Sequence, residues 1–210
     1  MTFSIIARCP DSGRLGVCTA TFSIACGRRN ESVRPNVGIS KSQAFYQRAT
    51  DPFALNLLAQ GYAPRQVLAV LEAGDPDFAY RQIGILHRDG AVAAHTGPSI
   101  GQWAGHVTGE GYAAFGNGLA GPEVVEGIAA GFMSAPAAPL EERLLQAIEG
   151  GCAAGGQAHN GVRRAERSAW LRVVDRQDFP QIDVRVDLHT HAVVELRRVF
   201  EAGLAARAAT

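Results

Sequence analysis

Two apolar segments rich in β-branched residues, 2–9 and 14–22, stand at the start of the chain with a short turn sequence between them. Each residue of that turn, Pro10-Asp11-Ser12-Gly13, favours chain reversal for its own steric or hydrogen-bonding reason. So short a connection joins antiparallel strands, because parallel strands need a long crossover. We therefore expect the chain to begin with a β-hairpin whose first strand starts at Thr2.

The remaining sequence alternates between strand-like segments and pairs of helices. Further strands are expected at residues 37–43, 80–87, 91–96, 111–115, 169–174 and 182–186. Helices are expected at residues 51–61, at residues 63–74, from Pro122, from Pro139 and at the C-terminal end. Asp51 is predicted to cap the first helix, because a proline follows it at the first helical position.

This order of elements predicts the fold class. Hairpins indicate antiparallel sheets, and helix pairs inserted between groups of strands indicate helical layers outside those sheets. We expect an α+β fold, a four-layer αββα sandwich of two antiparallel sheets covered by helices. No linker or repeat divides the sequence, so we expect a single domain over residues 1–210.

Composition indicates which kinds of molecule the protein is expected to bind and where it is expected to occur. Twenty acidic and twenty basic residues cancel, so no net charge indicates nucleic acid or an anionic membrane. No apolar run approaches the length of about 18 residues that a transmembrane helix needs. The four cysteines have no CxxC spacing, which favours reduced thiols over bridged or zinc-bound ones. We expect a soluble, cytoplasmic homodimer that acts on a small molecule without a cofactor.

Thr2 is the first candidate for chemistry, because loss of Met1 would give one residue both a hydroxyl and a free α-amine. A free α-amine has a pKa of roughly 7.7–8.0, so it can accept the hydroxyl proton near neutral pH. Removal of methionine is sterically permitted when the next residue is small, as threonine is. The hydroxyl would attack a carbonyl, and the amine would return the proton to the leaving nitrogen. The alternative is a chance Met-Thr start.

Three further residues are candidate catalytic residues. Asn117 stands between Gly116 and Gly118 after a predicted strand, where N–H groups could converge on an oxyanion; a purely structural turn is the alternative. Lys41, the only lysine among twenty basic residues, could hold the amine deprotonated or bind a substrate carboxylate. Glu110 is a candidate orienting carboxylate.

A loop between two predicted strands supplies candidate substrate-binding residues. His95 and His106 flank this loop and Trp103 lies within it, and loops fixed at sheet ends commonly line pockets. Gly116 and Gly118 are assigned to substrate binding as well, because their backbone can approach a ligand closely. A hydrogen-bonded structural histidine is the alternative for both histidines.

Two other groups of residues carry weaker hypotheses. Asp187, His189 and His191 alternate, and on a strand they would share one face as metal ligands can. Because the segment precedes a helix, a loop with solvated side chains is preferred, and no metal site is predicted. The basic pair Arg28-Arg29 is interpreted as solvated, with attraction of an acidic substrate as the alternative.

Several motifs occur in the order found in a bacterial protein family: Met1-Thr2-Phe3-Ser4-Ile5, Ala94-His95-Thr96-Gly97, Trp103-Ala104-Gly105-His106, Thr108-Gly109-Glu110-Gly111-Tyr112, Gly116-Asn117-Gly118-Leu119-Ala120-Gly121-Pro122 and Asp183-Val184-Arg185-Val186-Asp187. On these motifs, nearly the whole chain resembles the domain of unknown function 1028 family, which is grouped with the N-terminal nucleophile (Ntn) hydrolases. The resemblance implies an αββα fold and hydrolysis of an amide-type C–N bond with Thr2 as the nucleophile.

The chain departs from the family pattern at three positions. Gln157 and Arg167 stand where the family usually has an Asp and a Gln, and Phe22 stands where a basic residue is often found. The substrate pocket of other members is therefore not transferred to this chain.

Three hypotheses follow. The preferred one is a cofactor-free hydrolase of a small amide, of ring-derived or carbamoyl type, with Thr2 as its nucleophile. The second is a non-catalytic relative that keeps the fold and binds a small molecule or a partner. The third, a metal-dependent hydrolase that uses pairs of histidines, is a distant alternative.

Overall fold

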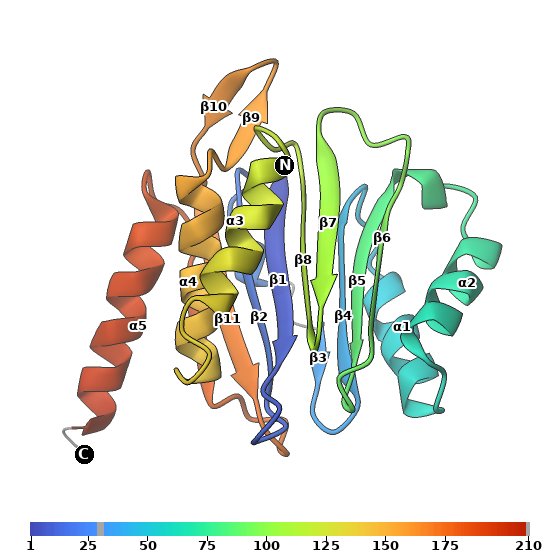
Figure 1. The fold of residues 1–210 in the computed structure, drawn as a ribbon, viewed down its shortest axis with the longest axis horizontal. Helices are drawn as coiled ribbons and strands as arrows, with labels where there is room; N and C mark the ends of the chain where they lie inside the picture. Colours follow the sequence, from blue (N-terminus) through green and yellow to red (C-terminus); the bar gives the residue numbers. More distant parts are fainter. Residues whose placement is uncertain (29–31, 209–210) are drawn as a thin grey trace.

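The computed structural model describes residues 1–28 and 32–208 of the chain. Its elements form four layers, helices–sheet–sheet–helices, which Figure 1 shows edge-on. One sheet is covered by α3 (Pro122–Met133), α4 (Leu140–Ala153) and α5 (Ala192–Ala208), and the other by α1 (Thr50–Ala59) and α2 (Pro64–Gly74). The predicted α+β sandwich is confirmed.

The larger sheet places the start of the chain at its centre. Its order is β12 (Ile182–Val186), β11 (Ser168–Val174), β2 (Leu15–Thr21), β1 (Thr2–Arg8), β8 (Tyr112–Asn117) and β7 (Ala104–Gly109). Every neighbouring pair is antiparallel, and the register sets Thr2 opposite Thr21 on one side and Asn117 on the other. Strands on both sides therefore fix the backbone of Thr2.

The smaller sheet has the order β3 (Val33–Arg34), β4 (Gly38–Ala44), β5 (Arg81–His87) and β6 (Val92–Thr96). A separate hairpin of β9 (Gln157–His159) and β10 (Val162–Arg164) lies near the N-terminal end of β1 in Figure 1. Two 3-10 helices, η1 (Cys26–Arg28) and η2 (Phe78–Tyr80), complete the described elements.

Alternation along β1 divides its side chains between two cores. Phe3 and Ile5 belong to the core that also contains the buried residues of α3 and α4. Ile6 belongs to the core between the sheets, together with residues of β2, β4, β5 and β8. A third core joins α1 and α2 to the smaller sheet. Because successive residues of a strand point to opposite faces, Thr2 and Ser4 face the space between the sheets.

That space is apolar at one end and polar at the other. Ile6 and Val17 fill the apolar end, whereas the buried side chains near the start of β1 include Ser4, Thr19 and Gln43. Burial of a polar group costs free energy unless it is hydrogen-bonded, and an apolar core would avoid that cost. The polar end therefore marks where a functional site is to be sought.

Four strands escaped the sequence analysis, and the shortest of them is the two-residue strand β3. The glycine-rich stretch before residue 111 contains β7, at the edge of the larger sheet, and the hairpin of β9 and β10 was not predicted at all. These strands are partly exposed and carry few β-branched residues, so their own sequence gives little strand signal.

Asp51 does not cap α1, so that prediction is wrong. The helix starts one residue earlier with Ala49 at the N-cap position, and Asp51 lies inside the first turn. Its carboxylate is buried and accepts hydrogen bonds from Ser40 Oγ, at 2.9 Å, and from the backbone N–H of Ser42, at 2.8 Å. These partners on β4 hold the side chain away from the helix end.

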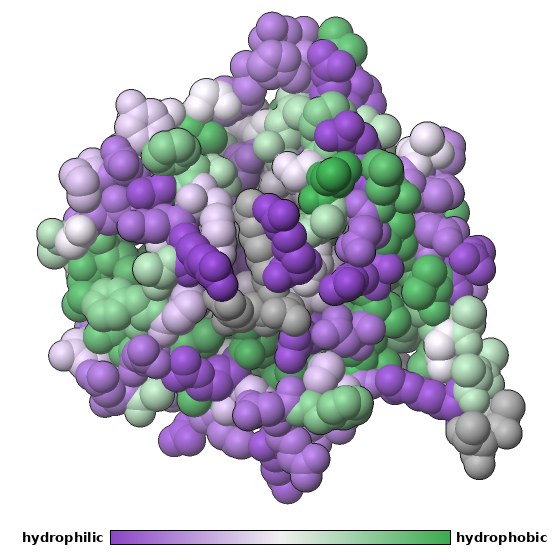
Figure 2. Space-filling view, turned by 180° about the vertical axis from the view of Figure 1, so that it is seen from behind, coloured by the Kyte–Doolittle hydropathy of each residue, from purple (hydrophilic) through white to green (hydrophobic). Residues whose placement is uncertain are grey.

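The surface is uneven in polarity. Figure 2, which views the molecule from behind, shows polar residues gathered over the middle of that face and apolar residues toward its two sides. Within the part of the chain that the structure describes, no helix combines the length and the apolar character needed to span a membrane.

Candidate functional site

A cavity of about 350 Å³ opens between the two sheets at their polar end. Thr2, Thr19 and Thr21 line it from the larger sheet, β4 and the residues after it line the opposite side, and the segment from Ser23 to Arg28 closes a third side. The volume lies at the lower end of the range for ligand sites, roughly 300–1,000 Å³. A small molecule fits this space.

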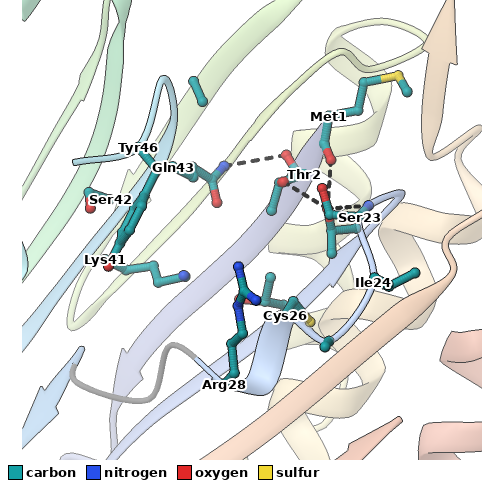
Figure 3. Close-up of a pocket in the computed structure, with 14 residues that line it drawn as sticks. Met1, Thr2, Ser23, Ile24, Cys26, Arg28, Lys41, Ser42, Gln43 and Tyr46 are labelled. Carbon is teal, nitrogen blue, oxygen red and sulfur yellow. Dashed lines mark hydrogen bonds between the residues drawn. The ribbon is translucent and has the colours of Figure 1, made fainter. Parts of the chain in front are cut away.

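Thr2 carries the reactive group with the best-defined surroundings. Its Oγ1 lies 3.0 Å from Thr21 Oγ1, and Thr21 Oγ1 donates to the carbonyl oxygen of Met1 at 2.8 Å (Figure 3). Because the Thr21 hydroxyl has a single hydrogen, Thr2 is the donor in the first contact. The backbone N–H of Ser23 also donates to Thr21 Oγ1, at 3.2 Å. These contacts hold both hydroxyl groups in place.

Met1 lines the same cavity and restricts access to Thr2. Its side chain lies against Gly118, where a Cβ would collide with Met1 Cγ. Gly118 also has a φ of 62°, in the left-handed region that glycine adopts readily. Burial lowers the pKa of the Met1 α-amine below its ordinary value. An amine at this end of β1 is therefore less protonated than one in water.

Two cations point into the cavity. Figure 3 shows the Lys41 side chain extending from β4 and the Arg28 side chain from η1 toward the space beside Thr2. Lys41 is buried at 5% exposure, whereas Arg28 is exposed. Arg29, the other member of the predicted basic pair, lies outside the described residues. The sequence analysis named Lys41 but treated Arg28 as solvated.

Asp51 lies on the opposite face of β4 from Lys41, between that strand and α1. Burial raises the pKa of its carboxyl from 3.8 to about 6, and the charge of Lys41 and the bonds from Ser40 and Ser42 offset part of that rise. Because Ser40 and Ser42 flank Lys41 in the sequence, these bonds fix the backbone from which Lys41 projects. Sequence reasoning missed this role, since the Asp-Pro pair signals a cap.

Cys26 is the other nucleophile in the cavity wall. Burial raises the pKa of its thiol above the ordinary value, and this effect exceeds the opposing effects of the hydrogen bond to Ser168 and the charge of Lys41. A thiol held neutral is a poor nucleophile, because the thiolate is the reactive form. Thr2 is therefore the better candidate.

The segment that carries Arg28 is firmly anchored. Phe22 N–H donates to Gln157 Oε1 at 2.8 Å, and Arg167 Nε donates to the Phe22 carbonyl at 2.6 Å. The Arg167 guanidinium also lies over the Phe22 ring, 4.1 Å from its centroid. Phe22, Gln157 and Arg167, the three positions that the sequence analysis set apart, therefore contact one another next to the segment that closes the third side of the cavity.

Asn117 lies beside Thr2 on β8 and shares its face of the sheet. It does not line the cavity, because its Nδ2 donates to Gln82 Oε1 at 3.0 Å. Gln82 Oε1 also accepts from Gln43 Nε2 at 2.8 Å, and Gln43 Nε2 reaches the Thr2 carbonyl at 3.3 Å. Asn117 therefore belongs to a buried network behind Thr2. Gly116 is in this network too, since its carbonyl accepts from Gln82 Nε2.

The other predicted site residues lie away from Thr2. His95 is on β6, stacks on the Phe78 ring at 4.0 Å and hydrogen-bonds the Phe78 carbonyl at 3.1 Å, so the structural alternative holds for it. His106 is exposed on β7, and its Nδ1 hydrogen-bonds Thr96 Oγ1 at 2.9 Å. Trp103 covers Gly105 next to it, and its carbonyl accepts from the N–H of Leu119. The cavity beside Thr2 includes none of His95, Trp103 and His106.

Glu110 lies at the opposite end of the larger sheet, in the turn between β7 and β8. It lines a different cavity, of about 440 Å³, with Arg8 and Arg143 among its other lining residues. Glu110 precedes the start of β8, whereas Asn117, the partner of Thr2, is the last residue of that strand. Glu110 is therefore too far from Thr2 and its neighbours to orient them.

The segment with Asp187, His189 and His191 is an exposed loop before α5, as the sequence analysis preferred. The N–H of His191 donates to His189 Nδ1 at 3.0 Å, so one ring nitrogen is already occupied. Among the residues that the structure describes, no three His, Cys, Asp or Glu side chains are grouped as metal ligands would be.

Comparison with known proteins gives the family. Residues 2–196 match the family of unknown function DUF1028. Among solved structures, the chain is similar to the crystal structure of protein SPO2555 from Silicibacter pomeroyi, assigned to the same family. The two are 27% identical with a TM-score of 0.83, over 96% of this chain and 88% of that one. No curated protein matches. The chain is therefore a member of the DUF1028 family.

Proposed function

We propose that this protein is an Ntn-type hydrolase that cleaves an amide-type C–N bond in a small molecule, with Thr2 as its nucleophile after Met1 is removed. One observation carries the proposal: Thr2 starts the central strand of the larger sheet, and its hydroxyl faces a cavity that Met1 also lines. Loss of Met1 would enlarge the cavity and leave the α-amine of Thr2 at its wall.

The α-amine of Thr2 is the general base in this proposal. In the unprocessed chain the amine at this end of β1 belongs to Met1, and burial lowers its pKa. We expect the same direction for the amine of Thr2, which makes it a better proton acceptor than an α-amine in water. The ammonium of Lys41 extends into the same space. The amine takes the hydroxyl proton as Oγ1 attacks the carbonyl carbon, and gives it to the leaving nitrogen as the C–N bond breaks. Water then cleaves the ester left on Thr2, which releases the acid and restores the hydroxyl.

Thr21 supports this proton transfer as a positioning residue. Its Oγ1 is within hydrogen-bonding distance of Thr2 Oγ1 and of the Met1 carbonyl, whose carbon is bonded to the nitrogen of Thr2. Once Met1 is gone, the Thr21 hydrogen loses its acceptor and can bond the nitrogen or the oxygen of Thr2. The hydroxyl of Thr21 thus bridges the two groups that exchange the proton.

Stabilisation of the oxyanion comes from donors that reach the cavity. Asn117 is held in the buried network, so we assign it the positioning of Gln82 and, through Gln43, of the Thr2 carbonyl. We assign stabilisation of the oxyanion to the ammonium of Lys41, a charged donor on the cavity wall, because a preformed cation costs no reorganisation as the oxyanion forms. Every group in this scheme belongs to the chain itself.

Treatment with a p-nitrophenyl ester tests the proposal, because such an ester acylates an activated nucleophile and releases a coloured product. Peptide mapping should find the acyl group on Thr2 and only in molecules that have lost Met1. Thr2→Val should abolish labelling, and Thr21→Val should slow it by about tenfold to a hundredfold. Thr19→Val is the matched control, because Thr19 also lines the cavity but bonds Ser4. Labelling of molecules that retain Met1 would contradict the proposal.

We also propose that the protein works in the cytoplasm. All four cysteines are free, and a reducing compartment keeps thiols in that state. The catalytic groups of this proposal all belong to the chain, and the proposed reactants are one small amide and water. Export of the protein to an oxidising compartment, detected by cell fractionation, would contradict this location.

A further inference from the structure

Among the residues that the structure describes, the charged side chains that line the cavity are cations. Lys41 and Arg28 come from two different walls and extend into the same space in Figure 3. Among the described lining residues, none is Asp or Glu, and the other polar groups are mostly hydroxyls. The carboxyl of Asp51 lies on the far face of β4, with its bonds directed to Ser40 and Ser42. A cavity with charge of one sign concentrates ligands of the opposite sign.

Arg28 has a fixed place although its side chain is exposed. The Ser23 carbonyl accepts from Ser168 Oγ at 2.8 Å, and the same Oγ accepts from Cys26 N–H at 3.2 Å. Ala25 N–H donates to the Asp187 carbonyl at 2.8 Å. These bonds tie the segment before Arg28 to β11 and to the loop that follows β12.

Gly27 brings this segment close to the sheet. A Cβ at Gly27 would lie 3.0 Å from Arg185 Cδ and 3.2 Å from Trp170 Cδ1, so a larger residue would push the segment outward. The absence of a side chain lets η1 rest on Trp170, which is fully buried. Close packing against the sheet therefore fixes the position of the backbone of Arg28. The guanidinium extends from this position into the cavity.

We infer that the substrate is a small amide that carries a carboxylate, and that Arg28 binds this carboxylate while Lys41 contributes a second positive charge. The amide bond in this inference rests on the proposed function. The carboxylate site is inferred independently, from the two cations that line the cavity. A guanidinium presents two parallel N–H donors that match the two oxygens of a carboxylate. With about 350 Å³ available, the carboxylate and the scissile amide belong to one short molecule.

Binding of glutarate and of its neutral analogue glutaramide tests the site without turnover. The two probes have the same length and differ in charge, and isothermal titration of the processed Thr2→Ala protein measures both affinities. Glutarate should bind about tenfold or more tightly than glutaramide, since a hydrogen bond to a charged group is the stronger one. Arg28→Gln should remove most of that preference. Arg65→Gln, on the exposed side of α2, should leave it unchanged.

Added salt gives a second readout. Because Arg28 is exposed, binding of glutarate should weaken as ionic strength rises, whereas binding of glutaramide should change little. Equal affinity for the two probes, or a preference that survives in Arg28→Gln, would overturn the inference.

Acylation separates this inference from the proposed function. The p-nitrophenyl monoester of glutarate should acylate Thr2 about tenfold faster than the p-nitrophenyl ester of glutaramic acid. If neither ester modifies Thr2, the nucleophile proposal fails, while the preference for glutarate over glutaramide still decides the carboxylate site. If both esters acylate Thr2 at one rate, the nucleophile stands and the carboxylate site is refuted.

Discussion

Ionisation of the buried Asp51 carboxyl should make the stability of the protein depend on pH, and one substitution can isolate this contribution. The side chain is 3% exposed, between β4 and α1, and its Oδ1 accepts from Ser40 Oγ and from Ser42 N–H. Asparagine at this position keeps an oxygen for both bonds and has nearly the same volume. Asp51→Asn therefore removes the ionisation while the packing and these two hydrogen bonds stay in place.

The size of the effect follows from the pKa. Burial raises the pKa of Asp51 from 3.8 to about 6, a change partly offset by the charge of Lys41 and by the bonds from Ser40 and Ser42. At about 1.4 kcal/mol per pKa unit, this corresponds to about 3 kcal/mol. Between those two pH values the folded state holds a proton that the unfolded chain has lost. This stabilisation is fully present below the lower value and is lost as pH rises through about 6.

Urea unfolding of both proteins, followed by circular dichroism from about pH 4 to about pH 7, measures this contribution. The variant should gain about 3 kcal/mol on the wild type over that range, and the difference should stay constant above about pH 7. Carboxyls with a lowered pKa, such as Asp75 and Asp89, act in the opposite direction in both proteins and cancel in the difference. Parallel curves for the two proteins would refute the reasoning, because they would show that Asp51 titrates alike in the folded and unfolded states.

Three further substitutions test the packing of the core, an open position on α5 and the ion pair between Arg163 and Glu166. Gly84→Ala should cost about 1–3 kcal/mol in the same urea unfolding assay, because its Cβ would lie 2.5 Å from a ring carbon of Phe115. Gly203→Ala, in the open on α5, is its control and should gain up to about 1 kcal/mol. Glu166→Gln should cost about 1 kcal/mol at neutral pH, a modest figure because Arg163 is partly exposed. Burial alone would raise the pKa of Glu166, but the bond from Arg163 and the other hydrogen bonds outweigh it and lower the pKa overall. The cost should vanish as pH falls through that lowered value, and a cost that persists in acid would show that the charge is not responsible.

Local sequence determined most of the elements. The hairpin of β1 and β2 was predicted from its turn residues, and the starts of α2 and α3 from Pro64 and Pro122, because these signals act within a few residues. Thr2 was singled out for a similar reason, since the α-amine and the hydroxyl belong to one residue. Lys41 was noticed only because lysine is so rare in this chain.

Tertiary structure decided the rest. Asp51 follows the pattern of a helix cap, yet its partners are on a strand that the chain reaches before the helix. Arg28 enters the cavity because Ser168 and Asp187, far away in the sequence, hold the segment before it. Turns and helix starts depend on interactions between residues close in the sequence, so they can be predicted from the sequence. The walls of a cavity come from segments that meet only when the sheets pack, and no local pattern records which residues will face each other there.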